Sequence, residues 1–236
     1  MSGSRYPSLL RVLAALALSC GVVLLAGPAV SGGATSVLLG SGGPAEASCP
    51  EDCLVEARVT GFQTSIEGSK KPFVTPARGR IVSWSLDLGV PEKMQIKAFN
   101  KRFGVSAARL SILKPIRRKE GGRKKYVLLR QSPVQRLRKH FGATPNFPLE
   151  RPLKVGQGHV VALTIPSWAP AFSTSQTDLS RWRASRAPTR KRGDCFTKGG
   201  FANLEAGAPH HKLQSERAYG CAFRGARLLY WATFVG

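Results

Sequence analysis

Apolar and polar residues alternate with a period of two through much of the chain, and this pattern most constrains the fold. In the segment 81–88 the residues of one face are all apolar: Val82, Trp84, Leu86 and Leu88. Such alternation is typical of a half-buried strand. The other segments of this kind are 55–60, 109–112, 126–130, 147–149, 159–165, 182–185 and 228–234. Because 25 glycines and 16 prolines supply turns, the pattern predicts an all-β fold, an antiparallel, jelly-roll-like β-sandwich of about eight strands.

One segment departs from this alternation. Residues 91–103 place Ile96, Phe99 and Phe103 at helical spacing. Pro91 suits the first turn of a helix, and Gly104 suits its end. We therefore expect one short helix inserted among the strands.

The N-terminus has the character of an export signal. Arg5 and Arg11 precede or interrupt an apolar stretch that extends to residue 26, and small residues follow it. This predicts a signal peptide over residues 1–34, cleaved after Ala29 or Ala34. The alternative is a retained N-terminal membrane anchor, although the apolar run is short for a span of about 20 residues. We expect a secreted, extracellular protein, with a membrane-anchored one as the alternative.

The composition changes again after the expected signal peptide. Residues 35–48 are rich in Gly, Ala and Ser and almost uncharged, which predicts a flexible linker. Residues 49–236 are expected to form a single β-sandwich domain.

Four cysteines remain after residue 34: Cys49, Cys53, Cys195 and Cys221. An even number in an exported chain indicates disulfides. Three pairings are open, and we favour Cys49–Cys53 with Cys195–Cys221. The alternative is a four-cysteine zinc site, but neither pair has the Cys-x-x-Cys spacing that is usual for zinc.

The chain carries 36 Lys and Arg against 13 Asp and Glu, a formal net charge of +23. The densest cluster lies at 114–125, where Pro115 and the pair Gly121-Gly122 predict a protruding hairpin loop. A second cluster comprises Arg136, Arg138, Lys139 and His140, and a third spans 181–192. These clusters are either solvated surface or a binding surface for anions, and together they favour anionic partners. The residues predicted to bind polyanions are Lys114, Arg117, Arg118, Lys119, Arg123, Lys124, Lys125, Arg186, Arg190, Lys191 and Arg192.

The tryptophans divide into core and candidate binding residues. Trp84 lies on an apolar strand face and is expected in the core. Trp168 lies between two prolines, and Trp182 lies among arginines, so both are candidates for stacking on a sugar. For Trp168 the alternative is that it closes one end of the core.

Signals for catalysis and cofactors are sparse. The chain has no recognisable nucleophile, zinc-protease, phosphate-loop or dinucleotide motif, so we predict no catalytic residue, no metal and no cofactor. The pair His210-His211 would need a third ligand such as Glu205 or Glu216 to bind a metal. A polysaccharide hydrolase remains an alternative if two of four carboxylates meet across a cleft; these are Glu67, Asp87, Glu150 and Asp178. A purely structural exported domain is a further alternative.

Four segments carry a family resemblance. They read GRIVSWSL at 79–86, RLSILKP at 109–115, YVLLRQS at 126–132 and PLKVGQGHVVAL at 152–163. Their order resembles a group of uncharacterised, secreted β-sandwich proteins of high-GC Gram-positive bacteria, over about residues 54–165 and more weakly over 182–236. His159 stands where that group more often has Asp. The resemblance implies the fold and export, and it implies no activity. The basic clusters and the export signal together lead us to expect a secreted, non-enzymatic domain that associates with anionic or sugar polymers of the cell envelope, or with other polyanions.

Overall fold

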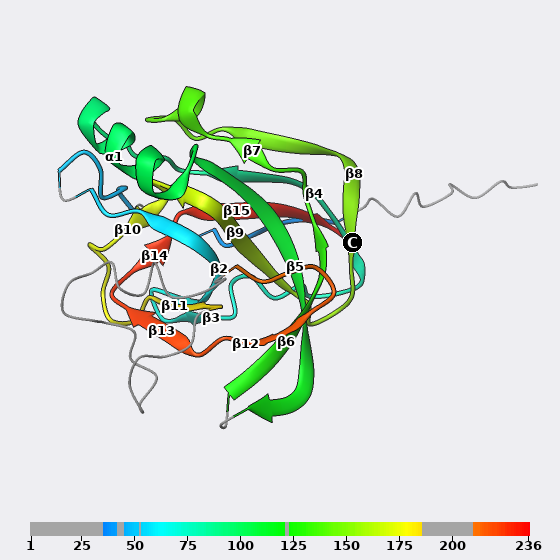
Figure 1. The fold of residues 1–236 in the computed structure, drawn as a ribbon. Coiled ribbons are helices and arrows are strands. Elements are labelled where there is room, and N and C mark those ends of the chain that lie inside the picture. The colour runs from blue at the N-terminus through cyan, green and yellow to red at the C-terminus, as the bar shows by residue number, and fades with distance from the viewer. Residues whose placement is uncertain (1–34, 42–44, 52, 121–122, 186–209) are drawn as a thin grey trace, which may run out of the picture. The chain divides into compact units, whose positions relative to one another are not determined.

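Strands form two principal antiparallel sheets in the part of the chain that the structure describes (Figure 1). This computed structural model describes residues 35–41, 45–51, 53–120, 123–185 and 210–236, with only the backbone at 117–120 and 123. The described residues belong to one unit, residues 34–236. The all-β, sandwich-like prediction is confirmed, and so is the single inserted α-helix among these residues.

The smaller sheet has four strands. Its order is β1 (Ser36–Leu39), β15 (Tyr230–Val235), β4 (Gly79–Leu86) and β8 (Asn146–Val155). The larger sheet has the order β12 (Glu216–Ala218), β6 (Arg123–Gln131), β5 (Ala107–Glu120), β9 (Val160–Ala169), β2 (Glu56–Ile66), β11 (Arg181–Ala184) and β13 (Cys221–Arg224). Short elements complete the fold: β3 (Ser69–Lys70), β7 (Gln135–Arg136), β10 (Phe172–Ser173), β14 (Arg227–Leu228) and the 3-10 turn Arg138–His140. Each of the eight predicted strand segments overlaps a strand.

The larger sheet closes on itself. Its two end strands, β12 and β13, are separated in the chain only by Tyr219 and Gly220. β12 pairs with β6, while β13 pairs with β11 at the other end of the strand order. One continuous segment therefore joins both ends of the sheet, and the two end strands are short, with three and four residues. Phe62 of β2 contacts Tyr126 of β6 although β5 and β9 lie between these two strands in the sheet, so the sheet curls around an inner face.

The main core contains apolar side chains from both sheets. Trp84 and Leu86 of β4 are fully buried, as the alternation predicts. Tyr230 of β15 stacks on Phe73, with ring centroids 4.1 Å apart. The Tyr230 hydroxyl donates to the carbonyl of Val161 in β9 at 3.0 Å, so the two sheets are joined by a buried hydrogen bond as well as by packing.

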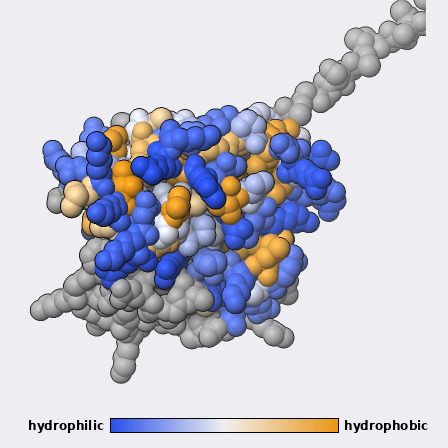
Figure 2. Space-filling model, turned by 45° about the horizontal axis from the view of Figure 1, so that its top comes forward, coloured by the Kyte–Doolittle hydropathy of each residue, from blue (hydrophilic) through white to orange (hydrophobic). Residues whose placement is uncertain are grey.

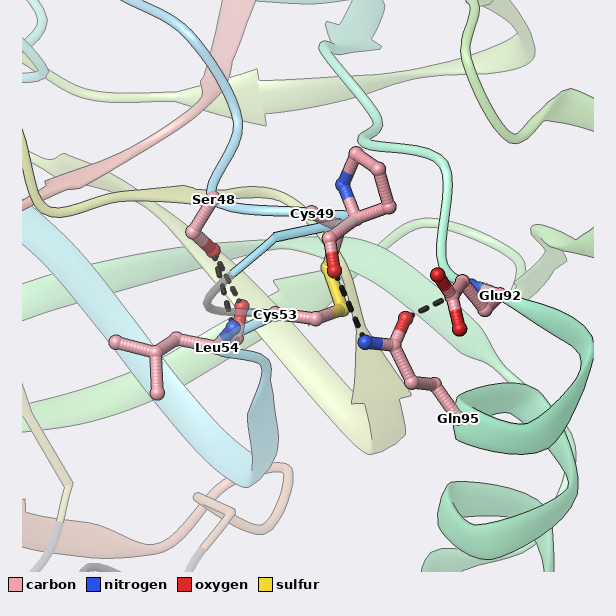
Figure 3. The surroundings of a disulfide bond; sticks show 7 residues. Ser48, Cys49, Cys53, Leu54, Glu92 and Gln95 are labelled. Atoms are coloured by element: carbon pink, nitrogen blue, oxygen red, sulfur yellow. Dashed lines mark hydrogen bonds between the residues drawn. A yellow bond between two sulfur atoms is a disulfide. The ribbon is translucent and has the colours of Figure 1, made fainter.

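The helix α1 (Lys93–Phe103) packs on a second, smaller cluster that includes the first disulfide. Cys49 and Cys53 are bonded to each other, as predicted. Gln95 of α1 donates from Nε2 to the carbonyl of Pro50 at 2.9 Å, and its Oε1 accepts from the N–H of Glu92 at 2.7 Å (Figure 3). The disulfide loop is thus tied to the first turn of the helix. A four-cysteine zinc site is wrong, because two of its thiolates are joined to each other.

Cys221 is also disulfide-bonded. Its predicted partner Cys195 lies outside the described residues, so that pairing stays a prediction.

The flexible linker predicted for residues 35–48 is wrong in part. Residues 36–39 form β1, which pairs with β15 from Ser36 opposite Val235 to Leu39 opposite Ala232. The run Val37-Leu38-Leu39 can join a sheet, and Leu39 is buried. The folded domain therefore begins before Cys49. The predicted signal peptide lies outside the described residues, and among the described residues no helix is both long enough and apolar enough to cross a membrane.

Candidate anion-binding pocket

A pocket of about 630 Å³ opens on the inner side of the closed sheet. β2 contributes Phe62 and Thr64, and β6 contributes Tyr126. Strand pairing brings the remaining walls together, because Arg183 of β11 lies opposite Phe62, and Pro115 of β5 lies opposite Tyr126. The pocket is therefore built by residues far apart in the sequence.

Three aromatic rings form its base. Phe62, Tyr126 and Tyr219 contact one another with all three centroid distances at 5.2 Å, two of them edge-to-face. Their side chains are almost fully buried. Edge-to-face contacts stabilise such rings in fixed orientations. Val74 and Val160 add apolar wall.

Three cations line the same pocket: Lys71, Lys124 and Arg183. The lysines are exposed, and Arg183 is half-buried. The Arg183 guanidinium donates from Nη1 to the carbonyl of Tyr219 at 3.1 Å. Burial raises the pKa of Tyr126, and Arg183 opposes that shift. None of the described lining residues is acidic, so the pocket is positive at neutral pH.

A buried histidine holds Tyr219, one of the three aromatic rings that form the floor of the pocket. His211 is fully buried, its Nε2 lies 2.7 Å from the carbonyl of Ser215, and its Nδ1 lies 3.1 Å from the hydroxyl of Tyr219. A carbonyl can only accept, so the neutral ring donates from Nε2 and accepts the Tyr219 hydroxyl at Nδ1. Burial is the main cause that lowers the pKa of His211 to about 4; Arg217 adds to the shift, and the Ser215 bond opposes it. His211 thus positions Tyr219.

The proposed metal ligands do not come together in the described part of the chain. No group of three His, Cys, Asp or Glu side chains lies there at metal-binding distance. Glu205 lies outside the described residues. Both ring nitrogens of His211 are already engaged within the protein.

Hydroxyl groups fill a further part of the inner face. Thr164 Oγ1 lies 2.9 Å from Thr60 Oγ1 and 2.6 Å from Ser111 Oγ, and the N–H of His211 donates to Thr60 at 3.0 Å. All three hydroxyl-bearing residues are buried. The alternation pattern places Thr60 and Thr164 on the polar side of their strands, and it contains no signal that this side is enclosed. Mutual hydrogen bonds satisfy these buried groups.

The first basic cluster is a strand hairpin, which corrects the predicted loop. β5 and β6 pair as far as Lys119 opposite Lys124 and Glu120 opposite Arg123. We call residues 114–125 the hairpin arm; its strands extend past their neighbours in Figure 1. Lys114 and Lys124 are exposed and Lys125 is half-buried. Arg117, Arg118, Lys119 and Arg123 have only their backbone described. Of the residues in the arm that the sequence predicts to bind polyanions, Lys124 also lines the pocket.

The role of the other predicted polyanion-binding residues stays a prediction. Arg186, Arg190, Lys191 and Arg192 lie outside the described residues. In the second cluster, Arg136, Arg138 and Lys139 are exposed. On the face shown in Figure 2, hydrophilic residues predominate and hydrophobic ones form separate patches.

Sugar stacking by Trp168 and Trp182 is wrong for this structure, because both side chains are 0% exposed. Trp182 stacks on Phe223, with ring centroids 4.3 Å apart and planes at 11°. Trp168 lies within β9, which runs through Pro166 to Ala169, so the prolines do not delimit a loop. The alternative for Trp168, a core position at one end of the sheet, agrees with its burial.

The four carboxylates of the hydrolase alternative do not line the pocket. Glu67 accepts from Ser180 at 2.8 Å and from Thr177 at 3.1 Å, so its oxygens are engaged in a turn. Asp87 accepts from Thr144 at 3.4 Å. Glu150 and Asp178 are exposed.

Comparison with protein-family models, curated proteins and solved structures finds no match. The resemblance to secreted proteins of high-GC Gram-positive bacteria therefore stays a prediction. The fold and the pocket define this chain as an all-β, sandwich-like protein with a cationic, aromatic-based pocket.

Proposed function

We propose that this protein is a secreted, non-enzymatic domain that associates with anionic or sugar polymers of the cell envelope. The observation that carries the proposal is the cationic pocket at the hairpin arm, where Lys71, Lys124 and Arg183 line one cavity without a described acid. Anions are attracted by such a concentration of positive charge, and attraction is strongest in a concave site.

The hairpin arm extends the positive surface beyond the pocket. It carries seven Lys and Arg and a single acid, Glu120. Lys124 belongs to both the arm and the pocket. A long anionic chain could therefore contact the arm over several charges while one unit enters the pocket.

Export is supported by two features. The N-terminal segment has the composition of a signal peptide. The Cys49–Cys53 disulfide is compatible with an oxidising, extracellular location.

The test is binding of the protein to purified, immobilised wall polymer at two salt concentrations. If about four counterions are released, affinity falls about 100-fold between 50 and 200 mM salt. A variant with Arg117, Arg118, Lys119 and Arg123 changed to Ser should lose most of this affinity and its salt dependence.

The matched control removes four exposed cations elsewhere: Arg78 and Arg80 beside or in β4, and Arg151 and Lys154 in β8. It has the same net charge as the arm variant and should bind nearly as well as the unchanged protein. Equal loss in both variants would show that net charge alone acts. Binding without salt dependence would overturn the proposal.

A further inference from the structure

We propose that the pocket binds one phosphate-bearing sugar unit, with the phosphate held by Lys71, Lys124 and Arg183 and the sugar ring against the apolar wall. This inference deepens the proposed function and rests on it for the source of the ligand, an acidic envelope polymer.

The positive charges of the pocket are not neutralised within the described part of the chain. The three cations come from the turn after β3, from β6 and from β11. In this part of the chain neither the Lys71 nor the Lys124 ammonium group forms a hydrogen bond or ion pair. Like charges that line one cavity repel each other, and a bound anion relieves that repulsion. A phosphate monoester at the end of a polymer carries up to two charges near pH 7, whereas a phosphate diester within the polymer carries one. A terminal sugar phosphate therefore suits three cations better than a carboxylate does.

Arg183 is already oriented for this task. One of its five N–H donors is used by the carbonyl of Tyr219, and others remain to bind two phosphate oxygens. Tyr219 itself is held by His211. Because Tyr219 and His211 are buried and Arg183 is bonded to Tyr219, little ordering is needed when a ligand binds.

The volume and the lining of the pocket favour a ligand that contains a compact ring over an inorganic anion. The volume of about 630 Å³ is far larger than one phosphate needs and lies within the range typical of small-molecule sites. Val74, Pro115 and Val160 supply apolar surface for a ring face. Thr64 and Tyr126 bring hydroxyls to the same lining, and within the described part of the chain the Tyr126 hydroxyl forms no hydrogen bond. A sugar ring offers both an apolar face and hydroxyl groups.

The experiment is calorimetric titration of the full chain with glucose 1-phosphate, inorganic phosphate, glucuronate and glucose at low salt. We expect a dissociation constant below about 1 mM for glucose 1-phosphate, at least about tenfold weaker binding of phosphate and glucuronate, and no heat with glucose. Lys71→Gln and Arg183→Lys should each weaken glucose 1-phosphate about tenfold. Lys154→Gln, an exposed position in β8, is the matched control and should change nothing.

Two results would overturn the inference: no binding of glucose 1-phosphate at about 10 mM, or binding that Lys71→Gln and Arg183→Lys both leave unchanged. Lys71 is exposed, so its variant is expected to fold, and thermal unfolding checks this. The arm variant separates the two proposals, because it should keep sugar-phosphate binding while losing polymer binding. Polymer binding without sugar-phosphate binding would leave the proposed function standing and refute the pocket. Sugar-phosphate binding without polymer binding would refute the envelope function and support the assignment of the pocket.

Discussion

The indole N–H of Trp168 in β9 donates to the side-chain oxygen of Asn100 in α1 at 3.0 Å. The same N–H also lies 2.9 Å from the carbonyl of Gly104, the residue at the end of the helix. Trp168 packs against Phe99 and Phe141 as well, with centroids 5.0 and 5.6 Å away. One buried side chain thus fixes the C-terminal end of α1 to the larger sheet.

Trp168→Phe should therefore lower the free energy of unfolding by about 2–3 kcal/mol, because it removes buried volume and leaves two acceptors without their donor. Urea unfolding followed by circular dichroism measures this. Trp231→Phe, at a half-buried position in β15, is the control and should cost less than about 1 kcal/mol. A cost for Trp168→Phe no larger than that of the control would contradict the role of Trp168 in holding α1.

Gly61 in β2 lies directly against Trp182. A Cβ at this position would be 2.7 Å from Cζ3 of Trp182 and 3.1 Å from Cδ1 of Leu228. Trp182 cannot shift freely, because it is fully buried and stacked on Phe223. Gly61→Ala should lower the free energy of unfolding by about 1–3 kcal/mol.

A double-mutant cycle tests the cause of that loss. In a Trp182→Leu background the added methyl group has space, so Gly61→Ala should cost clearly less there than in the unchanged protein. Gly236→Ala, where the nearest atom is 3.4 Å away, is the control and should be neutral. Equal costs in both backgrounds would mean that contact with Trp182 is not the reason.

Strand positions could be predicted from the sequence because half-buried strands alternate regularly, as β4 does around Trp84. The helix was predicted from Ile96, Phe99 and Phe103, and the Cys49–Cys53 pair from its short spacing. These are local signals, and each depends on fewer than 15 residues.

The pocket could not be predicted in the same way. It depends on the closure of the larger sheet by residues 216–224, which no local pattern reveals. Closure of the sheet buries Thr60 and Thr164, although polar side chains on one face of a strand usually indicate that this face is exposed to solvent. It also brings Lys71 and Arg183 into one cavity, although they are 112 positions apart (183 − 71). The sequence did not predict the burial of Trp168 and Trp182 for the same reason. Prolines and arginines beside a tryptophan do not indicate which strand will pack on its side chain.

The Cys49–Cys53 disulfide closes a loop of five residues, so its expected contribution to stability is small. Cys49→Ser with Cys53→Ser should lower the free energy of unfolding by about 2 kcal/mol in the chain-entropy model. Substitution is preferable to a reducing agent, because Cys221 is disulfide-bonded too.

Gln95→Met separates the disulfide from the docking of its loop. This change removes both hydrogen bonds of the Gln95 amide, the one to the carbonyl of Pro50 and the one from the N–H of Glu92, and keeps the disulfide. It should cost about 2 kcal/mol, about 1 kcal/mol for each bond. A loss above about 5 kcal/mol in the double Ser variant would contradict the small-loop estimate.

His211 should make the protein less stable as the pH falls. Its pKa is lowered to about 4 in the folded state, whereas a histidine in an unfolded chain titrates near 6.5. Between these values the unfolded chain binds a proton that the folded protein does not, so the free energy of unfolding decreases from pH 7 toward pH 4. The contribution of His211 to this decrease is at most about 3 kcal/mol.

Urea unfolding of the unchanged protein and of His211→Gln at pH 7.5, 6, 5 and 4.5 isolates this contribution. The variant should be less stable at pH 7.5, because Tyr219 and Ser215 lose a well-placed partner, and the difference should narrow toward pH 4.5. Burial also lowers the pKa of His140 and His159, but both residues are present in the two proteins, so their effects cancel in the comparison. Repulsion among the many cations cancels in the same way. Parallel pH profiles would show that a charged His211 is tolerated in the fold, and the role of this histidine in holding Tyr219 at the base of the pocket would then be wrong.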